Sequence, residues 1–297
     1  MKSLLFFVNE RARSGGAVPV LLRSLAAPLL QSVPTSVVRF VDDDGIRKGL
    51  ETLKRGMTPV AVGGDGTLVS VVRILREAGR AEEPIGVLPL GTGNGVAHSL
   101  GIGDLSQATE ALVTGAPRSL DVMTTTHPDA PLSLLSISVG VESLAMQDFA
   151  KWRRTSRWVG ALAGGLRRGT RRVSGITVEA DGQRHVSPRD QFCNVGLYNV
   201  PCYGFGVTPH PRADAEDGLA DLRIHRGRVG YWAYMAAALL NRASPLNRRP
   251  DWLRIQHATI SSPLPVQIDG ETLPAAQFDV NVLRGAVRIL ATVTETS

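Results

Sequence analysis

Cysteine is scarce in this sequence: Cys193 and Cys202 are the only two among 297 residues. Two cysteines make neither a disulfide framework nor a zinc-binding spacing, so we expect a protein of the reducing cytoplasm. Apolar residues make up 43% and charged residues 20%, a balance that excludes a disordered or fibrous chain. A chain of this length can bury a substantial core without disulfides, and a norm of roughly 150 residues per domain predicts about two domains.

Long apolar runs are also absent. The most apolar stretch of the C-terminal half, residues 231–240, is much shorter than the ~20 residues that cross a bilayer. The N-terminal run, residues 3–8, is short for the apolar region of a signal peptide and precedes a turn, so it is predicted to be a buried strand. We therefore expect a soluble protein that binds a membrane surface at most.

Acidic residues are absent from one segment, residues 151–172, although the chain has 27 Asp and Glu against 33 Lys and Arg. The formal net charge is +6 and this segment alone carries +8, so the rest of the chain carries −2. Nucleic acid, acidic lipid and a phosphorylated substrate all fit a segment of this charge. Its basic residues are Lys151, Arg153, Arg154, Arg157, Arg167, Arg168, Arg171 and Arg172.

Short apolar strands alternate with amphipathic helices over the first 120 residues. This alternation predicts an α/β N-terminal lobe with an open, mostly parallel sheet covered by helices. The expected strands are residues 3–8, 35–41, 58–62 and 85–89, and the expected helices are residues 18–31, 46–55, 68–79 and 95–100.

Strand patterns dominate after Asp121, with two helical stretches at residues 144–166 and 229–241. They predict a β-rich, mainly antiparallel C-terminal lobe. We place the boundary near Asp121, which gives domains of residues 1–121 and 122–297, with the last strand able to return to the first lobe. The expected strands are residues 132–139, 175–180, 191–199, 219–225, 258–262, 265–268, 277–283 and 287–293.

Glycine-rich loops follow two of the strands in the first lobe. Gly63-Gly64-Asp65-Gly66-Thr67 joins a buried strand to a helix, and Gly91-Thr92-Gly93-Asn94-Gly95 follows the next strand. Glycine lets a ligand approach the bare backbone, and a helix N-terminus attracts anions, so each loop is a candidate phosphate cradle. Both lie at the carboxyl edge of the predicted sheet, where open α/β sheets bind ligands. The alternative for the first loop is a tight turn with a solvent-exposed Asp65.

These two loops, the second preceded by Pro89, resemble the motifs of the diacylglycerol kinase catalytic family, which includes bacterial lipid kinases, sphingosine kinases and ceramide kinases. Three more segments are similar to family motifs and extend the resemblance along most of the chain. They are Asn9 with Ser14-Gly15-Gly16, the segment from Tyr203-Gly204 through Pro209 and Ala213 to Asp217-Gly218-Leu219, and Asp269-Gly270-Glu271.

The resemblance implies a two-lobed lipid kinase, with ATP and Mg²⁺ as cofactors and a cleft between the lobes. Residues 1–121 would form the ATP-binding catalytic domain, and residues 122–297 the domain for the lipid substrate. The γ-phosphoryl group of ATP would pass to a hydroxyl of a diacylglycerol- or sphingoid-like lipid. The residues that the resemblance places at the nucleotide are Asn9, Gly63, Gly64, Gly66, Thr67, Ser70, Gly91, Thr92, Gly93 and Asn94.

The resemblance also assigns the acidic residues. Asp65 would lie beside the phosphates and Mg²⁺, and Glu271, aided by Asp269, would accept the proton of the attacking hydroxyl. Asp217, with the carbonyl groups of Asp214 and Leu219, would match a structural metal loop of bacterial members.

The chemistry agrees with these roles, because phosphoryl transfer needs positioning, charge neutralisation and a proton acceptor within hydrogen-bond reach. Asp269 and Glu271 would share one side of the chain if the extended geometry of the preceding strand continues. The alternative is an exposed β-turn, which Asp-Gly favours.

Three positions depart from the family pattern and keep alternatives open. Glu10 stands where the family has Pro, Val69-Ser70 where it often has Asn-Glu, and Gly95 where it usually has Asp. One alternative is an NAD kinase-like phosphotransferase, although its further motifs are missing. The other is a catalytically weak relative that binds lipid or nucleotide.

The basic segment 151–172 lies in the lobe expected to hold the lipid. It combines positive charge with Trp152, Trp158 and a helical pattern, which is typical of contact with an anionic membrane surface. No nucleic-acid-binding motif accompanies the charge, so no nucleic acid partner is expected. The alternative is a solvated helix face. We expect a cytoplasmic protein with peripheral contact at the inner membrane face.

Overall fold

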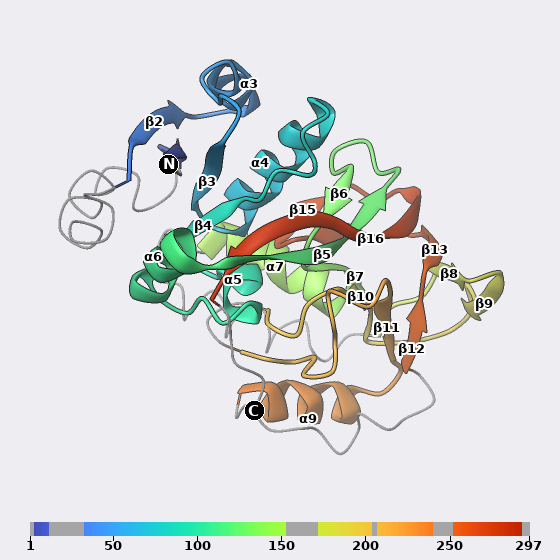
Figure 1. The fold of residues 1–297 in the computed structure, drawn as a ribbon. Helices are drawn as coiled ribbons and strands as arrows, with labels where there is room; N and C mark the ends of the chain where they lie inside the picture. Colours follow the sequence, from blue (N-terminus) through green and yellow to red (C-terminus); the bar gives the residue numbers. More distant parts are fainter. Residues whose placement is uncertain (1–2, 12–32, 153–171, 204–206, 240–251, 293–297) are drawn as a thin grey trace. The chain divides into compact units, whose positions relative to one another are not determined.

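The structure is a computed structural model that describes residues 3–11, 33–152, 172–203, 207–239 and 252–292 (Figure 1). The chain divides into two compact units. The first comprises residues 1–120, 202–206 and 285–297, and the second comprises residues 121–201 and 207–284. No helix in the described ranges is long and apolar enough to cross a membrane.

The first unit is built on a parallel four-stranded sheet in the order β2-β1-β3-β4. This confirms the predicted open parallel sheet. Residues 4–8 of β1 are buried on both faces, as expected for a central strand beneath helices. The strands are β1 (Ser3–Asn9), β2 (Thr35–Phe40), β3 (Met57–Gly63) and β4 (Gly86–Pro89). The helices are α3 (Asp43–Leu50), α4 (Asp65–Glu77), α5 (Gly95–Ser99) and α6 (Leu105–Thr114).

Side-chain caps decide where two of these helices begin. The Asp42 carboxylate accepts a hydrogen bond from the N–H of Gly45 at 3.1 Å, so α3 starts three residues before the predicted helix 46–55. The Asp104 carboxylate caps α6 in the same way through the N–H of Gln107 at 2.9 Å. The sequence reading did not predict α6. The predicted helix 18–31 lies outside the described residues.

The second unit contains an antiparallel sheet in the order β12-β11-β10-β7-β14-β15. A second sheet has the order β6-β5-β16-β13-β8-β9, and its pairs β5–β6, β8–β9, β8–β13 and β13–β16 are antiparallel. One hydrophobic core joins side chains from both, including Ile137, Leu197 and Phe278. The predicted β-rich, antiparallel half is therefore confirmed. Its helices are α7 (Val141–Trp152) and α9 (Arg228–Leu239).

The strands of these two sheets are mostly short. They are β5 (Ala116–Thr125), β6 (Leu132–Ser133), β7 (Ser136–Gly140), β8 (Thr177–Ala180), β9 (Gln183–Val186), β10 (Asn194–Tyr198), β11 (Ala220–His225), β12 (Trp252–Ile255), β13 (His257–Ser261), β14 (Val266–Ile268), β15 (Glu271–Leu273) and β16 (Gln277–Ala291). The predicted strands 277–283 and 287–293 form the single strand β16, in which Gly285 adopts a φ of +59°. The unit boundaries fall inside β5 and β16.

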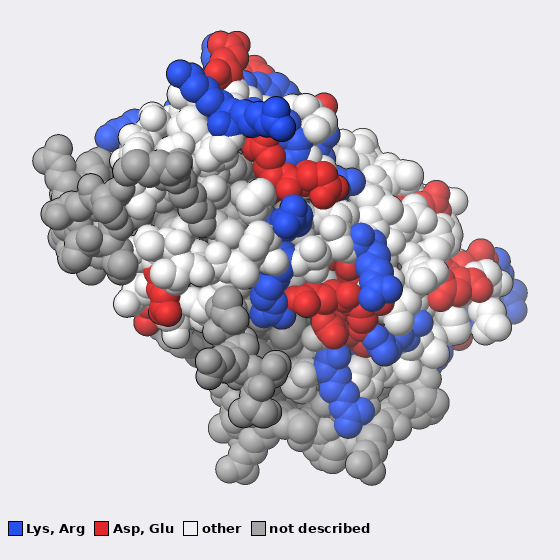
Figure 2. All heavy atoms as spheres, in the orientation of Figure 1, with Lys and Arg blue, Asp and Glu red and all other residues white. Residues whose placement is uncertain are grey.

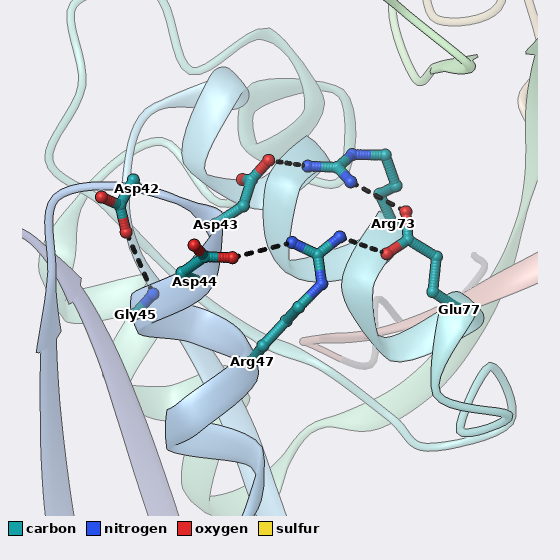
Figure 3. Close-up of polar contacts among 7 residues, drawn as sticks. All are labelled: Asp42, Asp43, Asp44, Gly45, Arg47, Arg73 and Glu77. Atoms are coloured by element: carbon teal, nitrogen blue, oxygen red, sulfur yellow. Dashed lines mark hydrogen bonds and ion pairs between the residues drawn. The ribbon is translucent and has the colours of Figure 1, made fainter.

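Charged side chains link α3 to α4 in the first unit (Figure 3). Glu77 accepts hydrogen bonds from Arg47 at 2.6 Å and from Arg73 at 2.8 Å, and Arg73 also pairs with Asp43. Burial raises the pKa of Glu77, but the hydrogen bonds from Arg47 and Arg73 outweigh it and lower the pKa below its ordinary value. Arg73 is only 18% exposed whereas Arg47 is 46% exposed, so Arg73 makes the less screened contacts.

Replacing Arg73 should therefore destabilise the first unit more than replacing Arg47. We expect Arg73→Met to lower the free energy of unfolding by about 1 kcal/mol and Arg47→Met by less than about 0.5 kcal/mol. Urea denaturation at low and at high salt measures both, and high salt should reduce the effect of Arg47→Met by the larger fraction, because ions screen exposed charges more than half-buried ones. Equal effects of the two variants would contradict this ranking.

Candidate functional site

The two glycine loops of the first unit touch each other through their backbones. A Cβ added to Gly64 would lie 3.0 Å from the Cα of Gly91, and one added to Gly91 would collide with the Cα of Gly64. The carbonyl of Gly63 accepts hydrogen bonds from the N–H groups of Leu90 and Gly91 at 2.9 and 3.1 Å. Glycine is therefore required at both contact positions, because any side chain would separate the loops.

Asn94 shapes the second loop. It adopts a φ of +55°, a left-handed conformation that asparagine tolerates better than most residues. Its side-chain oxygen accepts the N–H of Gly91 at 3.0 Å, and its amide donates to the carbonyls of Pro89 and Gly91 at 3.1 and 3.2 Å. The loop is thus folded around the Asn94 amide before α5 begins.

Asp65 joins the first loop to the second. As the first residue of α4, it directs its carboxylate at the start of α5, where the N–H groups of Gly95 and Val96 donate to it at 3.0 and 3.1 Å. These are N-terminal helix groups that have no partner within their own helix. Burial raises the pKa of Asp65, although the backbone hydrogen bonds oppose the rise. The carboxylate therefore braces the two loops, and the sequence reading did not predict this contact.

Asn9 connects the end of β1 to the same place. Its amide donates to the Thr67 hydroxyl at 3.0 Å, and its oxygen accepts the N–H of Arg11 at 2.9 Å. A Cβ at Gly63 would collide with the Thr67 side chain, so this glycine makes room for Thr67. The carboxyl ends of β1, β3 and β4 thus form one connected edge.

The start of α4 leaves an open backbone surface at this edge. Gly66 is exposed, and a Cβ there would meet no protein atom within 4 Å. Because the N-terminus of a helix carries partial positive charge, this surface fits a phosphate group. Three of the other predicted nucleotide residues take no part in the contacts described above. Ser70 and Gly93 are half-buried, Thr92 is exposed, and the segment 14–16 lies outside the described residues.

The Asp269-Gly270 pair forms the turn of the hairpin between β14 and β15. Both residues have positive φ, +48° and +85°, and Ile268 pairs directly with Glu271. The expectation that Asp269 and Glu271 share one side of an extended chain is therefore wrong, and the alternative β-turn forms. Glu271 lies exposed at the first position of β15.

Asp269 is half-buried in this turn and holds neighbouring backbone of the second unit in place. Its carboxylate accepts hydrogen bonds from the Ser133 hydroxyl at 2.6 Å and from three consecutive backbone N–H groups at 2.8–3.0 Å, those of Leu134, Leu135 and Ser136. Burial raises the pKa of Asp269, and the hydrogen bonds from Ser133 and the backbone oppose the rise. Asp269 thus fixes the link between β6 and β7, which explains why the predicted strand 132–139 is broken in two.

The predicted metal residues lie in a loop held by Asp121. The Asp121 carboxylate accepts the N–H of Gly218 at 2.6 Å, and its own N–H donates to Ala215 at 2.6 Å. Asp217 accepts the N–H of Leu219 at 2.9 Å and pairs with Arg254, while Asp214 accepts the N–H of Glu216 at 3.0 Å. Among the residues that the structure describes, no group of three His, Cys, Asp or Glu side chains is placed to hold a metal.

The sequence reading missed a buried polar network on one face of the sheet formed by β7, β10 and β11. The Tyr198 hydroxyl donates to Glu142, and the Tyr234 hydroxyl lies 2.6 Å from a ring nitrogen of His210. Burial, together with the charge of Arg223, lowers the pKa of His210 well below its ordinary value. Strict alternation of polar and apolar residues in β7, Ser-Ile-Ser-Val, was the signal that could have revealed a polar face.

The basic segment 151–172 falls almost entirely outside the described residues. On the described part of the face drawn in Figure 2, basic and acidic side chains are interspersed.

The fold and the two glycine loops define the class of protein. It has an α/β unit with a candidate anion site at the carboxyl edge of its sheet, followed by an antiparallel β unit. Residues 3–125 match the family profile described as the diacylglycerol kinase catalytic domain. A Pseudomonas aeruginosa PAO1 protein named "Probable lipid kinase YegS-like" is 31% identical over 264 residues, 85% of this chain and 82% of the relative. A Salmonella newport protein named "Probable lipid kinase YegS" is 28% identical over 257 residues, 84% of this chain and 81% of the relative.

The chain therefore belongs to the diacylglycerol kinase catalytic family, as its motifs predicted. A solved structure described as a diacylglycerol kinase from Bacillus anthracis str. Sterne shares the fold. Its TM-score is 0.75 at 18% identity, covering 98% of this chain and 97% of that one.

The stabilising role of Asp269 can be tested by comparison with a second Asp-Gly turn in the same unit. Asp181-Gly182 also has positive φ at both residues, +47° and +79°, but Asp181 is exposed. We expect Asp269→Asn to lower the free energy of unfolding by about 1–3 kcal/mol, because an amide cannot accept all the N–H donors around it. Asp181→Asn should cost less than about 0.5 kcal/mol, since water replaces its partners. Thermal or urea unfolding measures both, and equal losses would refute this role.

Proposed function

We propose that this protein is an ATP-dependent lipid kinase that phosphorylates a hydroxyl of a diacylglycerol- or sphingoid-like lipid. One observation carries the proposal: the two glycine loops are locked together at the sheet edge and leave the backbone open at Gly66. Membership of the family, with relatives named as lipid kinases, supports it.

The chain's own groups supply binding and positioning. The open backbone at Gly66 and the N-terminus of α4 fit the phosphates, and Asn9, Ser70 and Thr92 border them. Bound ATP would supply the phosphoryl group. Asp65 acts by holding the loops at a fixed separation, since its two oxygens already accept N–H groups. Fixed donors of this kind stabilise developing charge without reorganisation, which is the main requirement of phosphoryl transfer.

Glu271 is proposed as the group that accepts the proton of the lipid hydroxyl. It is exposed, whereas Asp269 is half-buried and both of its carboxylate oxygens accept hydrogen bonds. Asp269 is therefore a positioning residue, because it fixes the hairpin that presents Glu271. Mg²⁺ is expected to bind together with the nucleotide, because proteins usually hold this ion through one or two carboxylates and the phosphates of the substrate.

The basic segment 151–172 is proposed to contact an anionic membrane surface from the cytoplasmic side. The support is its eight basic residues without an acid, together with Trp152 and Trp158.

Nucleotide binding is tested by filling the open backbone surface. Gly66→Ala should leave unfolding unchanged or slightly raise stability, because the Cβ meets no protein atom and alanine favours helix. The same methyl group would occupy the space of a phosphate, so ATP affinity measured by calorimetry should fall about tenfold or more. Gly227→Ala, also in open space but in the second unit, is the control. Unchanged ATP affinity in Gly66→Ala would overturn the proposed cradle.

Phosphoryl transfer is tested with labelled ATP and a set of acceptors: diacylglycerol, monoacylglycerol, a sphingoid base, phosphatidylglycerol and NAD. We expect label in a lipid, and a loss of about 10²–10⁴-fold in Glu271→Gln with ATP binding retained, because a proton acceptor is removed. Glu179→Gln, an exposed acid of the same unit, should keep full activity.

Label in NAD alone would favour the NAD kinase-like alternative. ATP binding without transfer to any acceptor would favour the catalytically weak relative.

A further inference from the structure

The loop of residues 213–219 is an acidic turn between His210 and β11. Asp121 holds this loop by two hydrogen bonds of 2.6 Å. Its carboxylate accepts the N–H of Gly218, and its own N–H donates to the carbonyl of Ala215. Asp214, Glu216 and Asp217 all lie within the loop. These three acids give the loop a formal charge of −3, which a cation would neutralise.

Two carboxylates of the loop accept hydrogen bonds from its own backbone. Asp214 and Asp217 each accept the backbone N–H two residues further on, at 3.0 and 2.9 Å. A Mg²⁺ or Ca²⁺ ion needs about six to eight oxygen ligands that point at one centre. The metal loop implied by the family resemblance has one carboxylate ligand, Asp217. One oxygen of Asp217 already accepts the N–H of Leu219, so a metal could bind only the other oxygen.

The second oxygen of Asp217 pairs with the guanidinium of Arg254. Arg254 lies in β12, opposite Asp221 of the neighbouring strand β11. Trp252 anchors β12 to β11, since its indole N–H donates to Asp221 at 2.5 Å. The position of Arg254 is therefore set by the sheet and not by the loop.

We infer that Arg254 is the resident cation of this loop and takes the place of a structural metal ion. A guanidinium stays charged at every physiological pH and is covalently part of the chain, so it neutralises Asp217 at any metal concentration. The stability of the second unit is then independent of divalent cations.

The test compares thermal unfolding in EDTA with unfolding in millimolar Mg²⁺ or Ca²⁺, for the wild type and Arg254→Met. The wild-type melting temperature should be the same in all three within about 1 °C. Arg254→Met should melt about 2–4 °C lower in EDTA and recover in Ca²⁺, because Asp217 then lacks its cation. Adding Asp217→Asn to Arg254→Met should abolish this recovery.

Two controls complete the design. Arg254→Lys keeps the positive charge and should remain insensitive to metal, with circular dichroism confirming the fold of every variant. Arg184→Met removes an exposed arginine that pairs with Glu179 elsewhere in the same unit, and should gain no metal response.

Two results would overturn the inference. A wild-type melting temperature that rises in Mg²⁺ or Ca²⁺ and loses this rise in Asp217→Asn would show a metal site. An Arg254→Met variant with wild-type stability and no metal response would show that the loop needs no cation. Neither measurement uses ATP or lipid, so the outcome does not depend on the proposed kinase activity.

Discussion

The contact between the backbones of Gly64 and Gly91 is the constraint on which the first unit depends. Two adjacent parallel strands deliver these glycines to one edge, and no side chain fits between them. Asp65 can reach the N–H groups of α5 only because the loops are this close. The contact between Gly64 and Gly91 also leaves Gly66 at an open edge. The packing of the loops and the candidate anion site therefore both depend on this contact.

Aspartate side chains also hold loops in place in the second unit. Asp269 gathers four donors in the link between β6 and β7, and Asp121 accepts the N–H of Gly218 in the acidic loop. Each carboxylate satisfies backbone N–H groups that no strand or helix serves, which would otherwise be costly to bury. These acidic side chains therefore maintain the shape of loops in or near the motifs. Glu271 is the exposed acid of the Asp-Gly-Glu segment.

The sequence predicted the parts of the molecule that local patterns control. Continuous apolar runs identified β1 and β3, and glycines after strands identified the loops that meet at Gly64 and Gly91. It did not predict α6 or the short strands β9 and β12. The partner of β12 is the distant strand β11, whereas β9 pairs with β8 across a two-residue turn. It also misjudged Asp269, because whether an Asp-Gly pair continues a strand or turns is decided by β15 returning to pair with β14. The bracing role of Asp65 was invisible for a similar reason, since its partners lie 30 and 31 residues away.

The central claim is that the two loops bind nucleotide as one unit. Hydrogen–deuterium exchange of the protein with and without ATP tests it most directly, because exchange reports the protection of individual backbone segments. We expect slower exchange in residues 63–70 and 90–97 together when ATP is present. Protection of one loop without the other, or of neither, would contradict it.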